Sequence, residues 1–195
     1  MTETKKKGRK QEILDAALHC FTENGIEATT IEMIRERSGA SVGSMYHHFG
    51  SKESIAVALY ADALDEYGEY QMALLARARD AEEGIKAIVH AYVDWISANP
   101  EKARFVLYSR GALAKSDAAG ELASRTKNHV PEVVHWFKPY IESGRLKNLP
   151  REIYPSLITG PAHDYARLWL SGRAKTDLKE YRELFAEAAW NAVKP

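Results

Sequence analysis

The side chains best suited to chemistry lie within one short stretch of the chain, residues 41–52. Ser44 carries a hydroxyl that can hydrogen-bond to the edge of a DNA base, and Val42 can pack on a thymine methyl group. Gly43 adds no side chain that would hold the backbone away from the duplex. Small residues at the start of a helix therefore favour close approach to bases, as in a helix that reads the major groove.

A second set of side chains in this stretch is suited to binding phosphate oxygens. Tyr46 supplies a hydroxyl, His47 and His48 supply imidazoles, and Lys52 supplies an ammonium group. We expect these groups to hold the register of the protein on DNA. An N-terminal arm adds five cations that can reach phosphates or the minor groove, namely Lys5, Lys6, Lys7, Arg9 and Lys10.

The residue spacings do not indicate a catalytic or metal site. His47 and His48 are neighbours, so they point about 100° apart on a helix, and no two histidines are three or four residues apart. His163 and Asp164 are also neighbours and cannot face each other as a base and its partner. Glycine-rich phosphate loops and dinucleotide-binding patterns do not occur. We therefore expect no catalytic residues, no metal, no cofactor and no enzymatic activity.

Composition argues against functions that depend on bulk charge. The 195 residues include 27 Lys plus Arg and 27 Asp plus Glu, which gives a formal net charge of zero. This balance disfavours a polybasic nucleic-acid coat or an acidic solvating protein. The 45% apolar and 28% charged residues are typical of a soluble globular protein with a real core.

One cysteine, Cys20, rules out an intramolecular disulfide and a cysteine-based zinc site. Its apolar neighbours predict a buried side chain rather than a reactive thiol. No apolar run approaches the roughly 18 residues of a membrane span, and the basic N-terminus lacks the apolar segment of a signal peptide. We therefore expect no membrane association and a cytoplasmic location.

Apolar residues recur with helical spacing along almost the entire chain, which predicts an all-α protein of about nine helices. The first helix is expected over residues 7–24, where Gly25 provides a left-handed stop. We predict that Thr29 and Glu32 form a capping box at the start of the second helix, which closes at Gly39.

A third short helix follows, capped by Ser41 and ended by Gly50. The fourth is predicted over residues 51–79, with an apolar stripe along one face. Three short helices thus fill the first fifty residues. The long fourth helix is expected to connect them to the remainder of the chain.

Prolines interrupt the helical pattern in the C-terminal part of the chain. We predict that Pro131 and Pro139 kink or restart the helix in their segment, and that a Gly-Pro pair kinks the helix over residues 153–171. Asp177 and Glu180 have the spacing of a capping box for the last helix.

About a quarter of the chain, residues 9–55, resembles the DNA-binding domain of the TetR family of transcriptional repressors. The match involves many positions at fixed spacing: Ile13, Leu14, Ala16, Ala17, Phe21, Gly25, Thr29, Thr30, Ile34, Gly39, Ser41, Gly43, Tyr46, Phe49, Lys52 and Glu53. The remaining residues are similar to the family's second domain in length and helical layout only. The resemblance implies a DNA-binding domain over residues 1–50 and a ligand-binding and dimerisation domain over residues 51–195.

The DNA-contact positions that the resemblance implies are Thr30, Ser41, Val42, Gly43, Ser44, Tyr46, His47, His48 and Lys52. Three positions depart from the family pattern. The family usually has alanine where this chain has Arg35, alanine where it has Ser38 and valine where it has Ala40. The side chains packed between the second and third helices are therefore expected to be smaller or more polar than is usual in the family. Because Val42 occupies a position that is often polar or basic, no operator sequence can be transferred from relatives.

The resemblance also implies a homodimer in which the last two helices of each protomer form a four-helix bundle. Two third helices would then read half-sites about 34 Å apart on a palindromic double-stranded DNA operator. Core burial within one chain remains the alternative for the apolar side chains of these two helices. They are Leu157, Tyr165, Leu168, Trp169, Leu178, Tyr181, Leu184, Phe185 and Ala188.

A small-molecule inducer of unknown identity is a further partner that the resemblance implies. The aromatic and imidazole side chains that could line its cavity are Tyr67, Tyr92, Trp95, Phe105, Tyr108, His129, Trp136, Phe137, His163, Tyr165 and Trp169. The implied function is a ligand-responsive repressor released from its operator by this inducer. An all-α small-molecule-binding protein or enzyme without sequence-specific DNA binding is the alternative, and activation instead of repression stays open.

Overall fold

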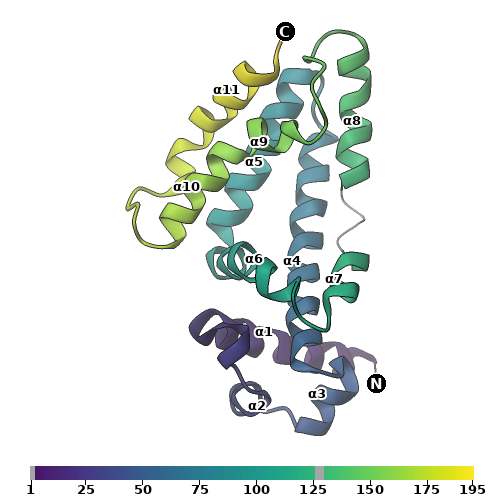
Figure 1. Cartoon of the computed structure of the whole chain (residues 1–195), viewed down its shortest axis with the longest axis vertical. Coiled ribbons are helices and arrows are strands. Elements are labelled where there is room, and N and C mark those ends of the chain that lie inside the picture. The colour runs from purple at the N-terminus through teal and green to yellow at the C-terminus, as the bar shows by residue number, and fades with distance from the viewer. Residues whose placement is uncertain (1–2, 126–129) are drawn as a thin grey trace. The chain divides into compact units, whose positions relative to one another are not determined.

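The computed structural model describes the backbone of residues 3–125 and 130–195, and the side chains of residues 8–124 and 132–195. Within these ranges the regular elements are eleven α-helices and a short 3₁₀ helix, so the all-α prediction is confirmed. The described helices outnumber the nine expected from the sequence because two segments, residues 116–144 and 153–171, each contain two helices. Figure 1 labels the elements along the chain.

The N-terminal helices are α1 (Glu3–Ala28), α2 (Ile31–Ser38) and α3 (Val42–Phe49). The backbone kinks at Gly25, whose φ is 79°, which places the change of direction where the sequence predicted a stop. A second short helical turn follows this kink, so α1 extends to Ala28.

The capping residue of α2 is Thr30, so the predicted capping box of Thr29 with Glu32 is wrong. The Thr30 side chain accepts a hydrogen bond from the Met33 backbone N–H at 3.2 Å. The Thr29 hydroxyl is instead buried and donates to the carbonyl oxygens of Cys20 and Gly25. Tertiary contacts with α1 therefore occupy the hydroxyl that local spacing had assigned to the cap.

Four helices follow: α4 (Lys52–Leu75), α5 (Ala81–Ala98), α6 (Pro100–Leu113) and α7 (Ala119–Arg125). Helix α4 ends four residues before the predicted limit of Arg79. The Arg79 backbone N–H donates to the Glu83 carboxylate at 2.9 Å and so belongs to the start of α5.

The C-terminal elements are α8 (Val130–Glu142), α9 (Ile153–Ile158), α10 (Gly160–Leu170), η2 (Leu178–Tyr181) and α11 (Arg182–Val193).

Two predictions about proline in these elements have different outcomes. The predicted break near Gly160 is confirmed because α9 and α10 are separate helices. Pro139 does not restart a helix but lies within the last turn of α8, where exposed backbone groups tolerate the missing N–H donor.

The last helix also starts differently from the prediction. Asp177 accepts a hydrogen bond from the Lys179 backbone N–H at 2.8 Å and so caps η2, while α11 begins only at Arg182. The capping function of Asp177 is therefore confirmed for a short 3₁₀ turn that precedes the helix.

The chain divides into two compact units. Unit 1 comprises residues 1–64 and 101–127, and unit 2 comprises residues 65–100 and 128–195. Helix α4 contributes residues to both. This division reflects contacts within each unit, whereas the functional division into residues 1–50 and 51–195 stays a prediction.

The core of unit 1 contains apolar side chains from each of its first four helices. Ile13 of α1, Ile34 of α2, Met45 of α3 and Ile55 of α4 are almost completely buried. Phe105 of α6 joins this core. Each of these helices contributes to one cluster, so burial of their side chains fixes the orientation of α3. A helix as short as α3 depends on such packing for its stability.

Phe105 stacks on Phe21 with 5.8 Å between ring centroids. Cys20, next to Phe21, is buried as the sequence predicted. Helix α6 therefore supports the helices that carry the DNA-contact candidates.

In unit 2, α5 packs against α11, as their neighbouring ribbons in Figure 1 show. Three side-chain pairs flank the apolar contact along α5. Lys86 pairs with Glu187, His90 with Glu183, and Asp94 with Arg182. These pairs fix the register of the two antiparallel helices.

Gly84 allows a close approach within unit 2. A Cβ atom at this position would overlap the indole ring of Trp136 on α8. The absence of a side chain at Gly84 is therefore a packing requirement for α8 on α5. Within the parts of the chain that the structure describes, no helix is long and apolar enough to cross a membrane.

Candidate DNA-binding surface and ligand pocket

The turn between α2 and α3 is held by backbone and side-chain caps. Gly39 adopts a left-handed conformation with φ of 61°, and its N–H donates to the Arg35 carbonyl at 2.9 Å. The Ser41 hydroxyl then accepts from the Ser44 backbone N–H at 3.1 Å. Ala40, between these caps, is buried. The segment therefore forms a tight helix-turn-helix with a defined direction for α3.

Helix α3 buries one side and presents the other to solvent. Met45 is buried, whereas Val42, Gly43, Tyr46 and His47 are exposed. The Tyr46 side chain is 54% exposed, which is unusual for a large aromatic residue. This outer side of α3 carries the side chains proposed to read bases and bind phosphates.

The other predicted DNA-contact residues lie on the same short segment or at the starts of neighbouring helices. Ser44 and His48 are half-buried on α3, and Ser41 is exposed at its N-terminus. Thr30 is exposed at the N-terminus of α2. The hydroxyls of Thr30 and Ser41 accept hydrogen bonds as caps but retain their own protons for donation.

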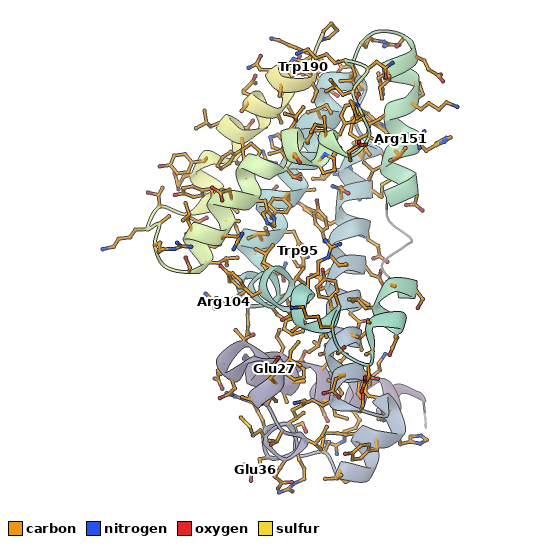
Figure 2. The ribbon with its side chains drawn as sticks, in the orientation of Figure 1. Glu27, Glu36, Trp95, Arg104, Arg151 and Trp190 are labelled. Carbon is orange, nitrogen blue, oxygen red and sulfur yellow. The ribbon has the colours of Figure 1, made fainter. Side chains whose placement is uncertain are left out.

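Cations on α2 are paired with carboxylates. Arg35 Nε donates to Glu32 at 2.8 Å, and Arg37 Nη1 donates to Glu23 at 2.9 Å. The hydrogen bond from Arg35 holds the pKa of the Glu32 carboxyl below its usual range. Glu36 is exposed and points outward from α2 (Figure 2). The positive charge of α2 is therefore largely balanced.

Two of the arm residues fall within the described side chains. Arg9 pairs with Glu12 at 2.9 Å, and Lys10 Nζ lies 5.9 Å from the Phe49 ring centroid. The side chains of Lys5, Lys6 and Lys7 lie outside the described residues.

Lys52 has a role that the residue pattern did not reveal. Its ammonium group donates to the carbonyl oxygens of Glu27 at 3.1 Å and Thr29 at 2.8 Å, and the side chain is only 19% exposed. These bonds join the first residue of α4 to the turn before α2. An ammonium group has three N–H donors, so one remains for another acceptor.

Four of the candidate ligand residues come together in unit 2. The Tyr67 ring lies 6.1 Å from Tyr92 and 5.8 Å from Trp95, measured between centroids. The Tyr92 hydroxyl and His163 Nδ1 are 2.8 Å apart. Gln71, which the sequence did not single out, donates to the Tyr67 hydroxyl at 2.8 Å. The result is a largely buried polar cluster between aromatic rings.

Burial favours the neutral forms of the titratable side chains in this cluster. It raises the pKa of the Tyr67 and Tyr92 hydroxyls far above their ordinary value. Burial also lowers the pKa of His163, and the positive charge of Arg167 acts in the same direction. The negative charge of Asp164 opposes this change but does not outweigh it. A neutral His163 can accept the hydrogen bond of Tyr92.

The other candidate ligand residues do not belong to this cluster. Phe105 lies in the core of unit 1, and Tyr108 is exposed on the same helix. Trp169 is half-buried on α10. His129 lies outside the described residues.

Three more of these aromatic residues pack within unit 2 but with other partners. Trp136 contacts Tyr140 with 4.6 Å between ring centroids, and Phe137 stacks on Tyr154. Tyr165 packs against Tyr181 at 5.1 Å between centroids. Helical spacing alone had not distinguished these core and surface contacts from a shared lining.

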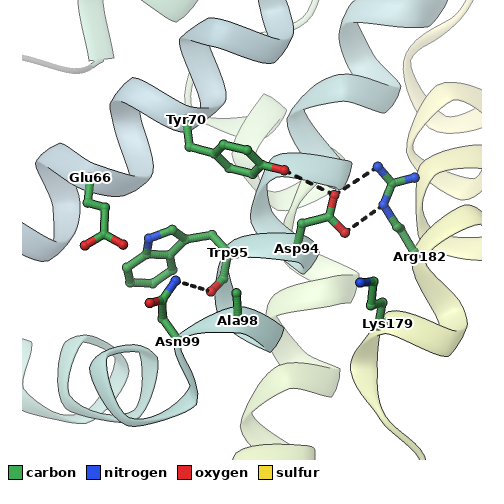
Figure 3. A pocket seen from close by; sticks show the side chains of 8 residues that line it. All are labelled: Glu66, Tyr70, Asp94, Trp95, Ala98, Asn99, Lys179 and Arg182. Carbon is green, nitrogen blue, oxygen red and sulfur yellow. Dashed lines mark hydrogen bonds and ion pairs between the residues drawn. The ribbon is translucent and has the colours of Figure 1, made fainter.

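A pocket of about 720 Å³ lies within unit 2 (Figure 3). It is lined by residues of α4, α5, the residue that follows α5, η2 and α11: Glu66, Tyr70, Asp94, Trp95, Ala98, Asn99, Lys179 and Arg182. Trp95 alone was a sequence candidate. The acidic lining residues Glu66 and Asp94 precede the basic ones, Lys179 and Arg182, by more than 80 positions, so no local signal joined the two groups.

A hydrogen-bonded ion pair crosses one end of this pocket. Arg182 donates to the Asp94 carboxylate through Nε at 2.9 Å and through a terminal nitrogen at 3.0 Å. The Tyr70 hydroxyl lies 3.5 Å from the same carboxylate. The charges of Asp94 and Arg182 are therefore mutually satisfied.

The buried indole nitrogen of Trp95 has no hydrogen-bond partner among the residues that the structure describes. Leaving such a donor unsatisfied costs about 1–3 kcal/mol. Figure 3 shows this nitrogen on the edge of the ring that faces Glu66. Among the described residues, no cluster of three or more His, Cys, Asp or Glu side chains could hold a metal ion.

The apolar residues expected on a dimer face have mixed positions. Leu184 is 64% exposed, and Ala188 is also exposed one turn later on α11. Tyr181 and Phe185 are half-buried beside Tyr165. Leu178 is completely buried, so its expected contribution to an exposed face is wrong.

Curated relatives match part of the chain. The HTH-type transcriptional repressor KstR2 of Rhodococcus jostii is 37% identical over 95 residues, which cover 48% of this chain and 46% of that protein. The HTH-type transcriptional repressor AcnR of Corynebacterium glutamicum is 46% identical over 50 residues, or 26% of this chain and 27% of that protein. The chain therefore spans about half the length of KstR2 and about a quarter of AcnR.

Solved structures match the fold over almost the full length. A TetR family transcription regulator from Marinobacter aquaeolei has a TM-score of 0.81 and 20% identity, with 99% of both chains covered. FadR from Bacillus subtilis, solved in complex with stearoyl-CoA, has a TM-score of 0.74 and 18% identity, with 93% of this chain and 98% of that chain covered.

At these identities the solved structures show likeness of fold alone. The family model described as bacterial regulatory proteins, tetR family, matches residues 13–59. These residues include the complete helix-turn-helix. The helix-turn-helix part of the chain therefore matches the tetR family of bacterial regulatory proteins.

Proposed function

We propose that this protein is a DNA-binding transcriptional repressor that releases its operator when a small molecule binds to its C-terminal domain. The observation that carries the proposal is the capped helix-turn-helix with a solvent-exposed outer side of α3. The curated relatives KstR2 and AcnR, both named as transcriptional repressors, support it. The proposed activity is regulation and not catalysis.

In this proposal, one group of residues contacts the bases of the DNA and a second group contacts its backbone. Val42, Gly43 and Ser44 approach base edges at the start of α3. The outer residues of the domain contact phosphate and sugar groups and set the register. They are Thr30, Ser41, Tyr46, His47, His48 and Lys52.

We infer that the repressor is a homodimer formed through α10 and α11. The exposure of Leu184 supports this inference. Burial of this large apolar side chain against a second protomer would remove it from water, which is favourable. A two-fold dimer presents two α3 helices to a palindromic operator, with half-sites about 34 Å apart.

The proposed domains are residues 1–50 for DNA binding and residues 51–195 for ligand binding and dimerisation. Helix α4 begins directly after the proposed DNA-binding domain and contributes residues to both compact units. A ligand that shifts α4 would change the separation of the two α3 helices and lower DNA affinity. The bound stearoyl-CoA of Bacillus subtilis FadR is an example of a ligand held by a protein of similar fold.

Selection of duplex DNA from a random pool, followed by gel shifts at moderate salt, tests this function. We expect enrichment of a palindrome and binding of one dimer per site. A variant with Ser44 replaced by alanine is expected to enrich a different central pattern. Enrichment of no sequence by the unmodified full chain would overturn the proposal and favour the alternative, a small-molecule-binding protein without operator recognition.

A further inference from the structure

Helix α3 carries no lysine, arginine or carboxylate side chain. Its residues are VGSMYHHF, and the side chains among them that can become cationic near neutral pH are His47 and His48 in the last turn. Phosphate groups attract positive charge, and most of the affinity of proteins for DNA depends on it. The charge that α3 presents to a duplex therefore depends on whether its histidines carry a proton.

The fixed charges of α2 balance one another. Arg35 is hydrogen-bonded to Glu32, and Arg37 to Glu23 of α1. Glu36 adds an exposed carboxylate to the same helix, so α2 contains two arginines and two glutamates. Helix α2 therefore supplies no net positive charge beside α3.

The charged groups that α4 and α1 place near α3 are also engaged. The ammonium group of Lys52 donates to two backbone carbonyl oxygens and lies 4.0 Å from the Glu53 carboxylate. Lys10 of α1 lies against the Phe49 ring, at the C-terminal end of α3. A positive charge on the outer side of α3 itself has to come from a histidine.

His47 is well placed to approach a phosphate group. It is exposed and lies one helical turn after Gly43. Helical side chains lean toward the N-terminus, so this imidazole extends toward the turn that carries Gly43. Beyond its own helix backbone and chain neighbours, a Cβ atom at Gly43 would meet nothing within 4 Å, so this part of the surface is open. His48, in contrast, is half-buried, with 6.2 Å between its ring centroid and that of Phe49.

A proton changes what an imidazole offers to a phosphate oxygen. The neutral ring has one N–H donor and one acceptor nitrogen, whereas the cation has two N–H donors and a positive charge. A charge-assisted hydrogen bond is roughly twice as strong as a neutral one. A phosphate therefore favours the charged ring, and binding to DNA draws a proton from solvent onto it.

We propose that His47 takes up a proton when α3 binds its operator, so that DNA affinity rises as the pH falls from 8 to 6. This inference rests on the proposed function and adds one proton per protomer to the binding reaction. Its sign is opposite to that of acid destabilisation. Burial lowers the pKa of His163, so acidification weakens the fold, and loss of folded protein would lower DNA affinity.

Fluorescence anisotropy with the selected operator duplex, at constant ionic strength, tests the proposal. We expect the affinity of the full chain to be at least about fivefold higher at pH 6 than at pH 8. The salt dependence of binding should be steeper at pH 6 by about one counterion per protomer. Titration calorimetry in two buffers with different ionisation enthalpies should show net proton uptake on binding. Circular dichroism at each pH verifies that the protein stays folded.

Three variants assign the proton to its residue. His47→Gln is expected to change its affinity by less than about twofold between pH 6 and pH 8 because the amide does not titrate. His47→Arg carries a permanent charge and should bind without proton uptake at either pH. His135→Gln, at an exposed histidine of α8 in unit 2, is the matched control and should retain the full pH dependence. The full pH dependence in His47→Gln, or proton uptake by His47→Arg, would overturn the assignment.

The same titrations separate this inference from the proposed function. Sequence-specific binding with equal affinity at pH 6 and pH 8 would retain the function and reject the proton. Absence of sequence-specific binding at every pH would reject both. Loss of the pH dependence in His48→Gln, with the dependence kept in His47→Gln, would place the proton on His48 and contradict the role of His47.

Discussion

The ammonium nitrogen of Lys52 lies 2.8 Å from the carbonyl oxygen of Thr29, so the first residue of α4 holds the turn before α2. Thr29 is itself buried and bonded to α1 through its hydroxyl. The start of the long helix is therefore tied to the base of the helix-turn-helix by polar contacts as well as by apolar packing.

Replacement of Lys52 by alanine is expected to lower the free energy of unfolding by about 1–2 kcal/mol because charge-assisted hydrogen bonds to two carbonyl oxygens are lost. Urea denaturation followed by circular dichroism measures this change. Lys115→Ala is the control, since this exposed lysine lies in the same unit. Equal stability of the two variants would show that the Lys52 contacts contribute nothing.

The same Lys52→Ala variant is expected to bind all DNA sequences more weakly. If its remaining N–H donor contacts a phosphate, the salt dependence of binding falls by about one counterion. Gel shifts at several salt concentrations measure both quantities. An unaltered affinity and salt slope would contradict a phosphate contact.

Ser44→Ala and Tyr46→Phe are expected to affect DNA binding differently. Ser44 is placed to contact bases, so its replacement changes the ranking of operator sequences. The Tyr46 hydroxyl is placed to contact phosphate, so its loss weakens binding to all sequences alike. A panel of operator variants compared by gel shift distinguishes the two effects. A changed ranking for Tyr46→Phe would reverse the assignment.

Gly84→Ala is expected to destabilise the protein by about 1–3 kcal/mol because its Cβ atom overlaps the indole of Trp136. Gly111→Ala is a matched control. Gly111 also lies in a helix but has open space around its Cβ position, so this variant should be neutral or slightly more stable. Trp136→Leu in the Gly84→Ala background is expected to recover stability, and no recovery would contradict the steric cause.

Stability is expected to fall as pH decreases from 7 to 5. Burial lowers the pKa of His163 in the folded state, so the unfolded chain binds more protons in this range and unfolding becomes easier. His90, whose pKa burial also lowers, contributes in the same direction. His163→Gln is expected to reduce the difference in thermal midpoint between pH 7 and pH 5. A variant with the full pH dependence would exclude His163 as a contributor.

Leu184→Glu is expected to convert a dimer into a monomer because it places a charge on the exposed apolar face of α11. Light scattering coupled to gel filtration measures the mass in solution. Glu180→Gln, at an exposed position on η2, serves as the control. A monomeric unmodified chain would reject dimerisation through this face.

Sequence alone was sufficient where the deciding interactions span a few residues. Gly39 and Ser41 marked the turn between α2 and α3 because left-handed backbone and a hydroxyl cap are local requirements. The resemblance over residues 9–55 therefore predicted the element that carries the proposed DNA contacts, and the family model matches residues 13–59.

Tertiary structure decided which of two equivalent local choices was made. Thr29 and Thr30 both offered a capping hydroxyl, and burial of Thr29 against the Cys20 carbonyl left Thr30 as the cap. Phe105 had the same aromatic character as Trp95 but became part of the core of unit 1. Residue type could not distinguish these outcomes because packing partners lie far away in sequence.

The pocket illustrates the same limit for function. Asp94 and Arg182 are 88 residues apart, yet they form a hydrogen-bonded ion pair at one end of the pocket. The helical pattern predicted that α5 and α11 exist as amphipathic helices. Only their packing fixed which side chains face one another, because ion pairing and burial depend on distances that periodicity does not specify.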